Sequence, residues 1–142
     1  VGAFAYAGQS CISVQRIFVR AEIYGEFREV FLGEVAGRAK AGDPADPATL
    51  VGPMINREAL EKTVAWVNEA VARGARLLTP LRVEGGVLHP VVLENVPRDA
   101  SVSCEEAFAP VVVLEPCATF ADGLAAINDS KFGLQAGVFT ND

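Results

Sequence analysis

The sequence is poor in basic residues and has no cluster of them. Its 12 lysines and arginines are outnumbered by 18 acidic residues, which gives a net charge of −6 at neutral pH. Because nucleic acids and anionic membranes bind basic surfaces, this balance argues against both kinds of partner. The sequence also has no apolar run long enough to span a bilayer, and no signal peptide opens it. We therefore expect a cytoplasmic protein that contacts neither nucleic acid nor membrane.

Cysteine and histidine are scarce as well. The three cysteines, Cys11, Cys104 and Cys117, are an odd number without CxxC spacing, which favours a protein of a reduced compartment over a disulfide scaffold or a metal site. The single histidine, His89, precedes a proline in a strand-like run, so we expect it to pack rather than to act in catalysis. A cysteine-hydrolase dyad of Cys11 with His89 has no supporting local signature. We predict no metal site.

Hydrophobic residues, by contrast, are abundant and regularly spaced. They make up 51% of the 142 residues, enough for one domain with a substantial core. Stretches with helical periodicity alternate with short β-branched and aromatic runs, which predicts an α/β fold, a layered sheet with flanking helices. The expected strands are 16–20, 75–79, 89–93, 110–114 and 136–140, and the expected helices are 21–40, 56–73 and one that begins after Thr119.

The helix at 56–73 has the clearest boundaries. Asn56 is a good N-cap, because its side chain can accept a hydrogen bond from the first helical turn. Ile55 and Leu60 occupy the two positions of a hydrophobic staple, and Gly74 is a natural C-terminal stop. A hairpin or loop is expected at the glycine pair after residue 84.

The run Gly8-Gln9-Ser10-Cys11 is the most informative local pattern. Gly8 allows a sharp turn, and Ser10 could cap a short helix that opens at Cys11. The N-terminal dipole of that helix would stabilise a thiolate. The two glutamates that follow Cys104 disfavour a nucleophilic thiolate there. Cys11 is therefore the candidate nucleophile.

Four motifs resemble, in order and over essentially the whole chain, those of the NAD(P)-dependent aldehyde dehydrogenases. Residues 4–11 match the family's Phe-x-x-x-Gly-Gln-x-Cys nucleophile pattern, and residues 105–111 resemble its Glu-Glu-x-Phe-Gly-Pro-Val cofactor motif. The other two matches are Asp43-Pro44 with Gly52-Pro53, and the closing run 128–134. The resemblance implies the family's α/β catalytic-domain fold.

The resemblance implies a complete reaction. Cys11 would attack an aldehyde carbonyl, hydride would pass to NAD or NADP, and a thioester would then be released as the acid. The backbone N–H of Cys11 would be one oxyanion donor. Glu106 would hydrogen-bond the nicotinamide ribose, and Phe108 would lie beside the nicotinamide. The sequence departs from the pattern at Ala109, where the family has glycine, and at Tyr6, where many members have asparagine.

Parts of the family's machinery do not occur in this sequence. The family places its general-base glutamate and a side-chain amide of the oxyanion hole upstream of the nucleophile, and only ten residues precede Cys11. No Gly-rich βαβ fingerprint appears. We therefore interpret residues 1–142 as a fragment of an aldehyde dehydrogenase catalytic domain without its dinucleotide-binding domain, from a homo-oligomeric parent that acts on a small aldehyde. Two alternatives are a coenzyme A-acylating member and a non-catalytic module used in assembly.

Overall fold

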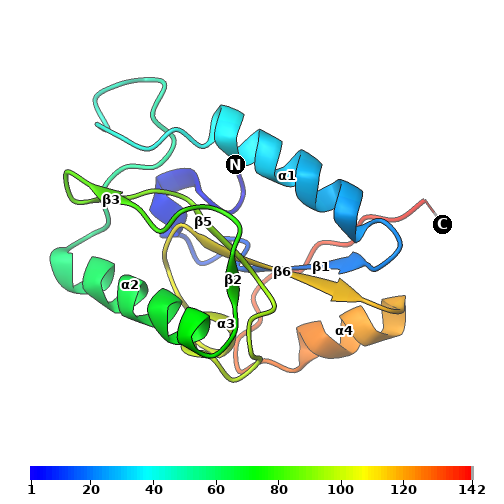
Figure 1. Ribbon diagram of the computed structural model, residues 1–142. Helices are drawn as coiled ribbons and strands as arrows, with labels where there is room; N and C mark the ends of the chain where they lie inside the picture. Colours follow the sequence, from blue (N-terminus) through cyan, green and yellow to red (C-terminus); the bar gives the residue numbers. More distant parts are fainter. Residues whose placement is uncertain (142) are drawn as a thin grey trace.

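A four-stranded sheet organises the computed structural model, which describes residues 1–141 (Figure 1). The strand order is β1-β6-β5-β2, with β1, β6 and β5 parallel and β2 antiparallel to β5. A separate hairpin pairs β3 with β4. In chain order the elements are η1 (Ala5–Gly8), β1 (Arg16–Arg20), α1 (Tyr24–Arg38), α2 (Arg57–Ala72), β2 (Arg76–Leu77), β3 (Val83–Glu84), β4 (Val87–Leu88), β5 (Val91–Glu94), α3 (Ser101–Cys104), β6 (Val111–Cys117) and α4 (Phe120–Asn128).

The helices form layers on the two faces of the sheet. In Figure 1, α1 lies above the sheet, while α2, α3 and α4 lie below it. Because β5 and β6 are central strands covered on both faces, they read as nearly continuous apolar runs. The predicted α/β layered architecture is confirmed.

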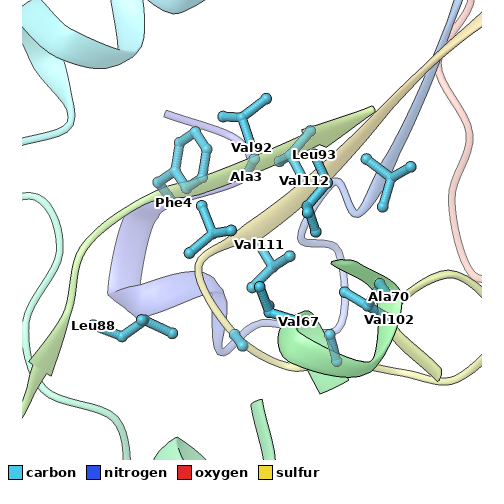
Figure 2. Packing of buried hydrophobic residues seen from close by; sticks show 14 of the residues in the cluster. Ala3, Phe4, Val67, Ala70, Leu88, Val92, Leu93, Val102, Val111 and Val112 are labelled. Atoms are coloured by element: carbon cyan, nitrogen blue, oxygen red, sulfur yellow. The ribbon is translucent and has the colours of Figure 1, made fainter. Parts of the chain in front are cut away.

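The core is centred on β5 and β6. Leu93 and Val112 are fully buried on these strands and point to opposite faces of the sheet, because Leu93 pairs with Val113 and Val112 pairs with Val92. Figure 2 shows this part of the core together with residues of α2 and α3. Val67 and Ala70 of α2 and Val102 of α3 are fully buried as well. The apolar spacing of the α2 sequence marks one face formed by Leu60, Val64, Val67 and Val71. The first three pack on the core, whereas Val71 is 37% exposed. This core holds the loops at the ends of β5 and β6 in fixed positions.

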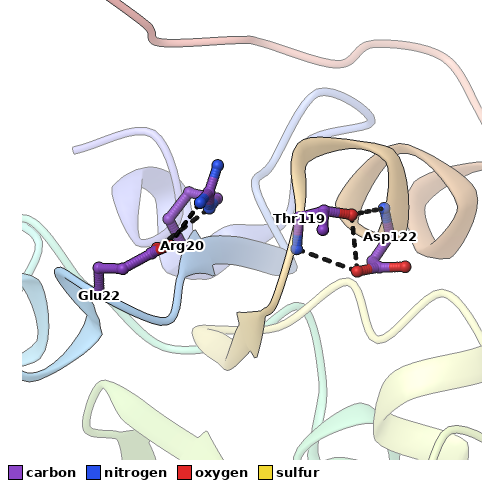
Figure 3. A network of polar contacts seen from close by, with 4 residues as sticks. All are labelled: Arg20, Glu22, Thr119 and Asp122. Carbon is purple, nitrogen blue, oxygen red and sulfur yellow. Dashed lines mark hydrogen bonds and ion pairs between the residues drawn. The ribbon is translucent and has the colours of Figure 1, made fainter.

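Side-chain caps begin two of the helices. The Asn56 side chain accepts a hydrogen bond from the Ala59 N–H at 2.8 Å, so the predicted N-cap of α2 is confirmed. Thr119 and Asp122 form a reciprocal capping box at the start of α4 (Figure 3). The predicted staple is wrong, because Ile55 is 80% exposed. Its N–H donates instead to Gln9 Oε1 at 2.7 Å, which fixes the backbone at this point.

Two of the expected strands differ from those in the structure. Residues 136–140 form no strand, and Phe139 among them is 99% exposed. Their run of apolar residues suits a strand, but a strand also needs a paired neighbour. The strand expected at 75–79 is reduced to the two residues of β2. The glycine pair does form the β3–β4 turn, with both glycines at positive φ.

A buried carboxylate that the sequence analysis missed joins the layers. Glu94, at the end of β5, is 3% exposed. It accepts hydrogen bonds from the Tyr24 hydroxyl at 2.7 Å and from Arg28 at 3.3 Å, and it pairs with Arg76. These donors come from α1 and β2, so the buried charge is compensated from two sides. The cluster fixes α1 over the sheet.

Candidate active site

A strained backbone turn precedes Cys11. Tyr6, Ala7 and Gly8 have φ values of 55°, 57° and 67°, so three successive residues lie in the left-handed region. Only glycine adopts this region without a steric cost, and non-glycine residues held in it cluster at functional sites. We call residues 4–15 the nucleophile loop.

Cys11 itself lies in a tight turn at the surface of this loop. The Ser13 N–H donates to the Ser10 carbonyl at 2.9 Å, which closes a single turn. The predicted short helix at Cys11 is therefore wrong. No second helical turn follows, because the Val14 N–H donates to the Gly2 carbonyl at 3.1 Å and the chain continues in an extended conformation. Cys11 is nevertheless exposed, so its thiol is accessible from solvent.

The cofactor motif contacts the nucleophile loop directly through the backbone. We call residues 105–110, between α3 and β6, the cofactor loop. A Cβ atom placed on Gly8 would lie 2.0 Å from the Ala109 carbonyl oxygen and 2.4 Å from its carbon. Since real Cβ atoms do not approach so closely, only glycine allows the two loops to touch here. Two motifs about a hundred residues apart in sequence therefore lie against each other.

The predicted cofactor residues project from this loop. Glu106 is exposed, and Phe108 is 40% exposed with a φ of 51°. Ala109 is buried and has no positive φ, so the alanine that replaces the family's glycine is accommodated. The left-handed position of the loop falls one residue earlier, on Phe108. Tyr6, the other departure, is also exposed.

The two remaining motifs attach to the same pair of loops. Gln9 accepts from the Ile55 N–H, shortly after the Gly52-Pro53 pair. Lys131 of the closing run pairs with Glu105, and this carboxylate raises the pKa of Lys131. The closing run thus contacts the cofactor loop directly, and the Gly52-Pro53 pair lies two residues before the partner of Gln9.

Gln15 is a further contributor that sequence reasoning missed. Its side-chain amide bonds the backbone of Val102, Glu105 and Ala107. A lone glutamine four residues after the cysteine carries no recognisable sequence signal. Only the tertiary structure shows its partners.

The other candidate residues, His89, Cys104 and Cys117, lie outside the two loops. His89 Nε2 lies 3.5 Å from Glu84 Oε2, next to the β3–β4 hairpin. Cys104 and Cys117 are half-buried and unpaired. Among residues 1–141 there is no group of three or more potential metal ligands. Within the same residues, no helix is long and apolar enough to cross a membrane.

The sequence model of the aldehyde dehydrogenase family matches residues 1–142. The chain belongs to this family. It is 48% identical over 141 residues to an aldehyde-dehydrogenase-like protein of Sinorhizobium fredii, covering 99% of the chain and 27% of that protein. It also matches an NADP-complexed glyceraldehyde-3-phosphate dehydrogenase from Bacillus halodurans at a TM-score of 0.90 and 28% identity, covering 99% of the chain and 29% of that structure.

A second solved structure was determined with the other cofactor. The aldehyde dehydrogenase of Mycobacterium tuberculosis complexed with NAD+ matches at a TM-score of 0.88 and 31% identity. The alignment covers 96% of the present chain and 29% of the mycobacterial one. The chain thus spans less than a third of the length of these aldehyde dehydrogenases.

We predict that Cys11 is the most reactive thiol of this aldehyde dehydrogenase chain. It is the exposed cysteine, whereas Cys104 and Cys117 are half-buried. Reaction with substoichiometric iodoacetamide, followed by peptide mapping, should place most of the label on Cys11. Unfolded chain should lose this preference. Faster labelling of Cys104 or Cys117 in the folded chain would contradict the assignment.

Proposed function

We propose that this chain supplies the nucleophile and the nicotinamide contacts of an enzyme that oxidises an aldehyde to a carboxylic acid with NAD or NADP. The main support is the close approach of Gly8 to Ala109, which brings the backbone of the nucleophile loop, with the exposed Cys11, against that of the cofactor loop, with Glu106 and Phe108. A nucleophile and a hydride acceptor must lie on opposite sides of one small carbonyl group. Two loops in backbone contact suit that requirement.

The proposed chemistry starts at the sulfur of Cys11. The thiolate forms a bond to the aldehyde carbon, and the carbonyl electron pair moves to oxygen, where the Cys11 N–H can donate to the resulting charge. The carbon–oxygen double bond then re-forms as the C–H bond breaks with its electron pair. NAD or NADP, when bound, accepts that pair as hydride. The thioester left on Cys11 is hydrolysed by water, which releases the acid and restores the thiol.

The residues of the cofactor loop fit a nicotinamide riboside. The exposed carboxylate of Glu106 can accept hydrogen bonds from two adjacent ribose hydroxyls. The partly exposed ring of Phe108 offers an apolar face to the nicotinamide. We assign both as cofactor-binding residues. No observation favours transfer of the acyl group to coenzyme A or a purely structural module.

We also propose that residues 1–142 are a fragment of a catalytic domain, with the dinucleotide-binding domain and the general base outside them. The chain's coverage of 27–30% of related aldehyde dehydrogenases supports this division. We further propose a cytoplasmic, homo-oligomeric parent that acts on a small aldehyde and binds neither nucleic acid nor membrane. Three unpaired cysteines and a net charge of −6 support the compartment and the absence of those partners. Two exposed apolar residues, Ile23 at the N-cap of α1 and Val30 within the helix, support a subunit contact.

The 142-residue chain alone is expected to show no measurable dehydrogenase turnover and very weak cofactor binding. Glu106 and Phe108 can hold only the nicotinamide end, since the pyrophosphate needs the helix N-terminus of a βαβ unit. Calorimetric titration with NAD and NADP, and a long NADH-absorbance assay with short aldehydes, test this. Micromolar cofactor binding, or turnover that depends on Cys11, would show that the chain is self-sufficient.

The proposed reaction is tested by trapping its covalent intermediate. The longer polypeptide that carries this chain is mixed with aldehyde and NAD or NADP, quenched in acid and digested. An acyl mass on the peptide that contains Cys11, formed only when both reactants are present, is the expected result. Oxidation without an adduct on Cys11, or no oxidation with either cofactor, would refute the proposal. Added coenzyme A separates hydrolysis from acyl transfer, because only an acylating enzyme would release acyl-coenzyme A.

A further inference from the structure

Gln15 ends the nucleophile loop, but its side chain belongs to a network in the cofactor loop. Its Nε2 donates to the Val102 carbonyl at 2.9 Å and to the Glu105 carbonyl at 2.7 Å. Its Oε1 accepts from the Ala107 N–H at 3.0 Å. Both amide hydrogens and the amide oxygen are therefore used. These three bonds surround the backbone immediately before Phe108.

Two of the three partners of Gln15 have little access to water. Val102 is fully buried and Ala107 is 2% exposed. If the amide were lost, the Ala107 N–H and the two carbonyls would have to find other partners or remain unpaired, which is costly in a buried site. The Gln15 carbonyl also accepts from the Val113 N–H at 2.9 Å, so its own backbone is registered on β6. The backbone of Gln15 is thus fixed on β6, and its side chain holds the cofactor loop.

We infer that Gln15 is a positioning residue: it sets the place of Glu106 and Phe108 relative to Cys11. The inference rests on the proposed function, because it concerns the cofactor in that reaction. The Gly8–Ala109 contact prevents the two loops from approaching further, but it supplies no attraction. The amide of Gln15 supplies a directional attraction between them through two hydrogen bonds, to Glu105 and Ala107, and its third bond ties it to Val102 of α3.

Gln9 provides a matched control on the same loop. It carries the same side chain, but its Oε1 accepts from the Ile55 N–H and its Nε2 donates within the nucleophile loop to the Tyr6 carbonyl at 3.3 Å. Neither bond reaches the cofactor loop. Replacement of either glutamine with methionine keeps the approximate shape and removes the hydrogen bonds, so the two variants differ in which segment they release.

The experiment combines kinetics with amide exchange. In the active polypeptide, Gln15→Met is expected to raise KM for NAD or NADP by about tenfold, because the hydrogen bonds to Glu105 and Ala107 no longer order the cofactor loop. The alkylation rate of Cys11, measured without cofactor, should stay within about twofold, since the Ser10–Ser13 turn does not depend on Gln15. A general loss of structure would instead change both quantities together.

Amide exchange tests the anchoring independently of activity. In the 142-residue chain, Gln15→Met should speed exchange at Ala107, and Gln9→Met should speed exchange at Ile55 but leave Ala107 unchanged. If Gln15→Met does not fold, Gln15→Glu is the second variant: it keeps an acceptor for Ala107 but has no N–H donors, and its KM should also rise.

Unchanged KM for the cofactor in a folded Gln15 variant would overturn the inference, as would unchanged exchange at Ala107 in Gln15→Met. The absence of aldehyde oxidation in the unmodified polypeptide would instead refute the proposed function. The two failures are therefore distinguishable.

Discussion

Replacement of Cys11 with serine in the active polypeptide is expected to lower the rate of aldehyde oxidation by about 10⁴-fold or more. A serine hydroxyl is far less nucleophilic at neutral pH, and the Ser10–Ser13 turn provides no side-chain base to activate it. Because Cys11 is exposed, the substitution should leave the folded structure intact. NADH absorbance measures the rate, and circular dichroism during heating checks the fold.

Cys104→Ser is the matched control. Cys104 is half-buried at the end of α3, and its thiol contacts the Asp99 carbonyl at 3.6 Å, a contact that a serine hydroxyl can also make. Its rate should remain close to that of the unmodified enzyme. If Cys11→Ser kept a substantial rate while Cys104→Ser lost it, the nucleophile would be wrongly assigned.

The fold could be predicted largely because its local signals agree with one another. The Asn56 cap, the apolar face that includes Val67, and the buried runs of β5 and β6 all point to the elements that form. The failures share a cause. Each failure depends on contacts with distant parts of the chain. The segment at Cys11 bonds to Gly2 instead of continuing as a helix, and Ile55 bonds to Gln9 instead of packing on Leu60. Residues 136–140 have no paired strand beside them.

The candidate site, like the fold, was only partly predictable from the sequence. Cys11 and Glu106 could be proposed as site residues because their types and neighbours match a recognisable pattern. Gln15 was not, because its role depends on residues about ninety positions away in the sequence. Side-chain amides bonded to a distant backbone leave no periodicity and no local motif. The strain at Phe108 was hidden for the same reason, since it is visible only in the backbone dihedral.

Replacement of Gly8 with alanine is expected to destabilise the folded chain by at least about 2 kcal/mol. The left-handed φ of 67° is unfavourable for alanine, and the added methyl would lie 2.0 Å from the Ala109 carbonyl oxygen, which is backbone and cannot rotate away. The nucleophile and cofactor loops must then separate. We therefore also expect oxidation by the active polypeptide to fall by about a hundredfold, because the cysteine no longer faces the cofactor at the correct distance.

Gly33→Ala is the matched control for this change. Gly33 lies within α1, and a Cβ atom placed on it would meet nothing within 4 Å. Alanine is the better helix former there, so the control should gain about 0.5–1 kcal/mol. Urea denaturation of both variants and of the unmodified chain measures the free energy of unfolding. If Gly8→Ala proved as stable as the unmodified chain and retained its rate, the close contact between the two loops would not be required for the site.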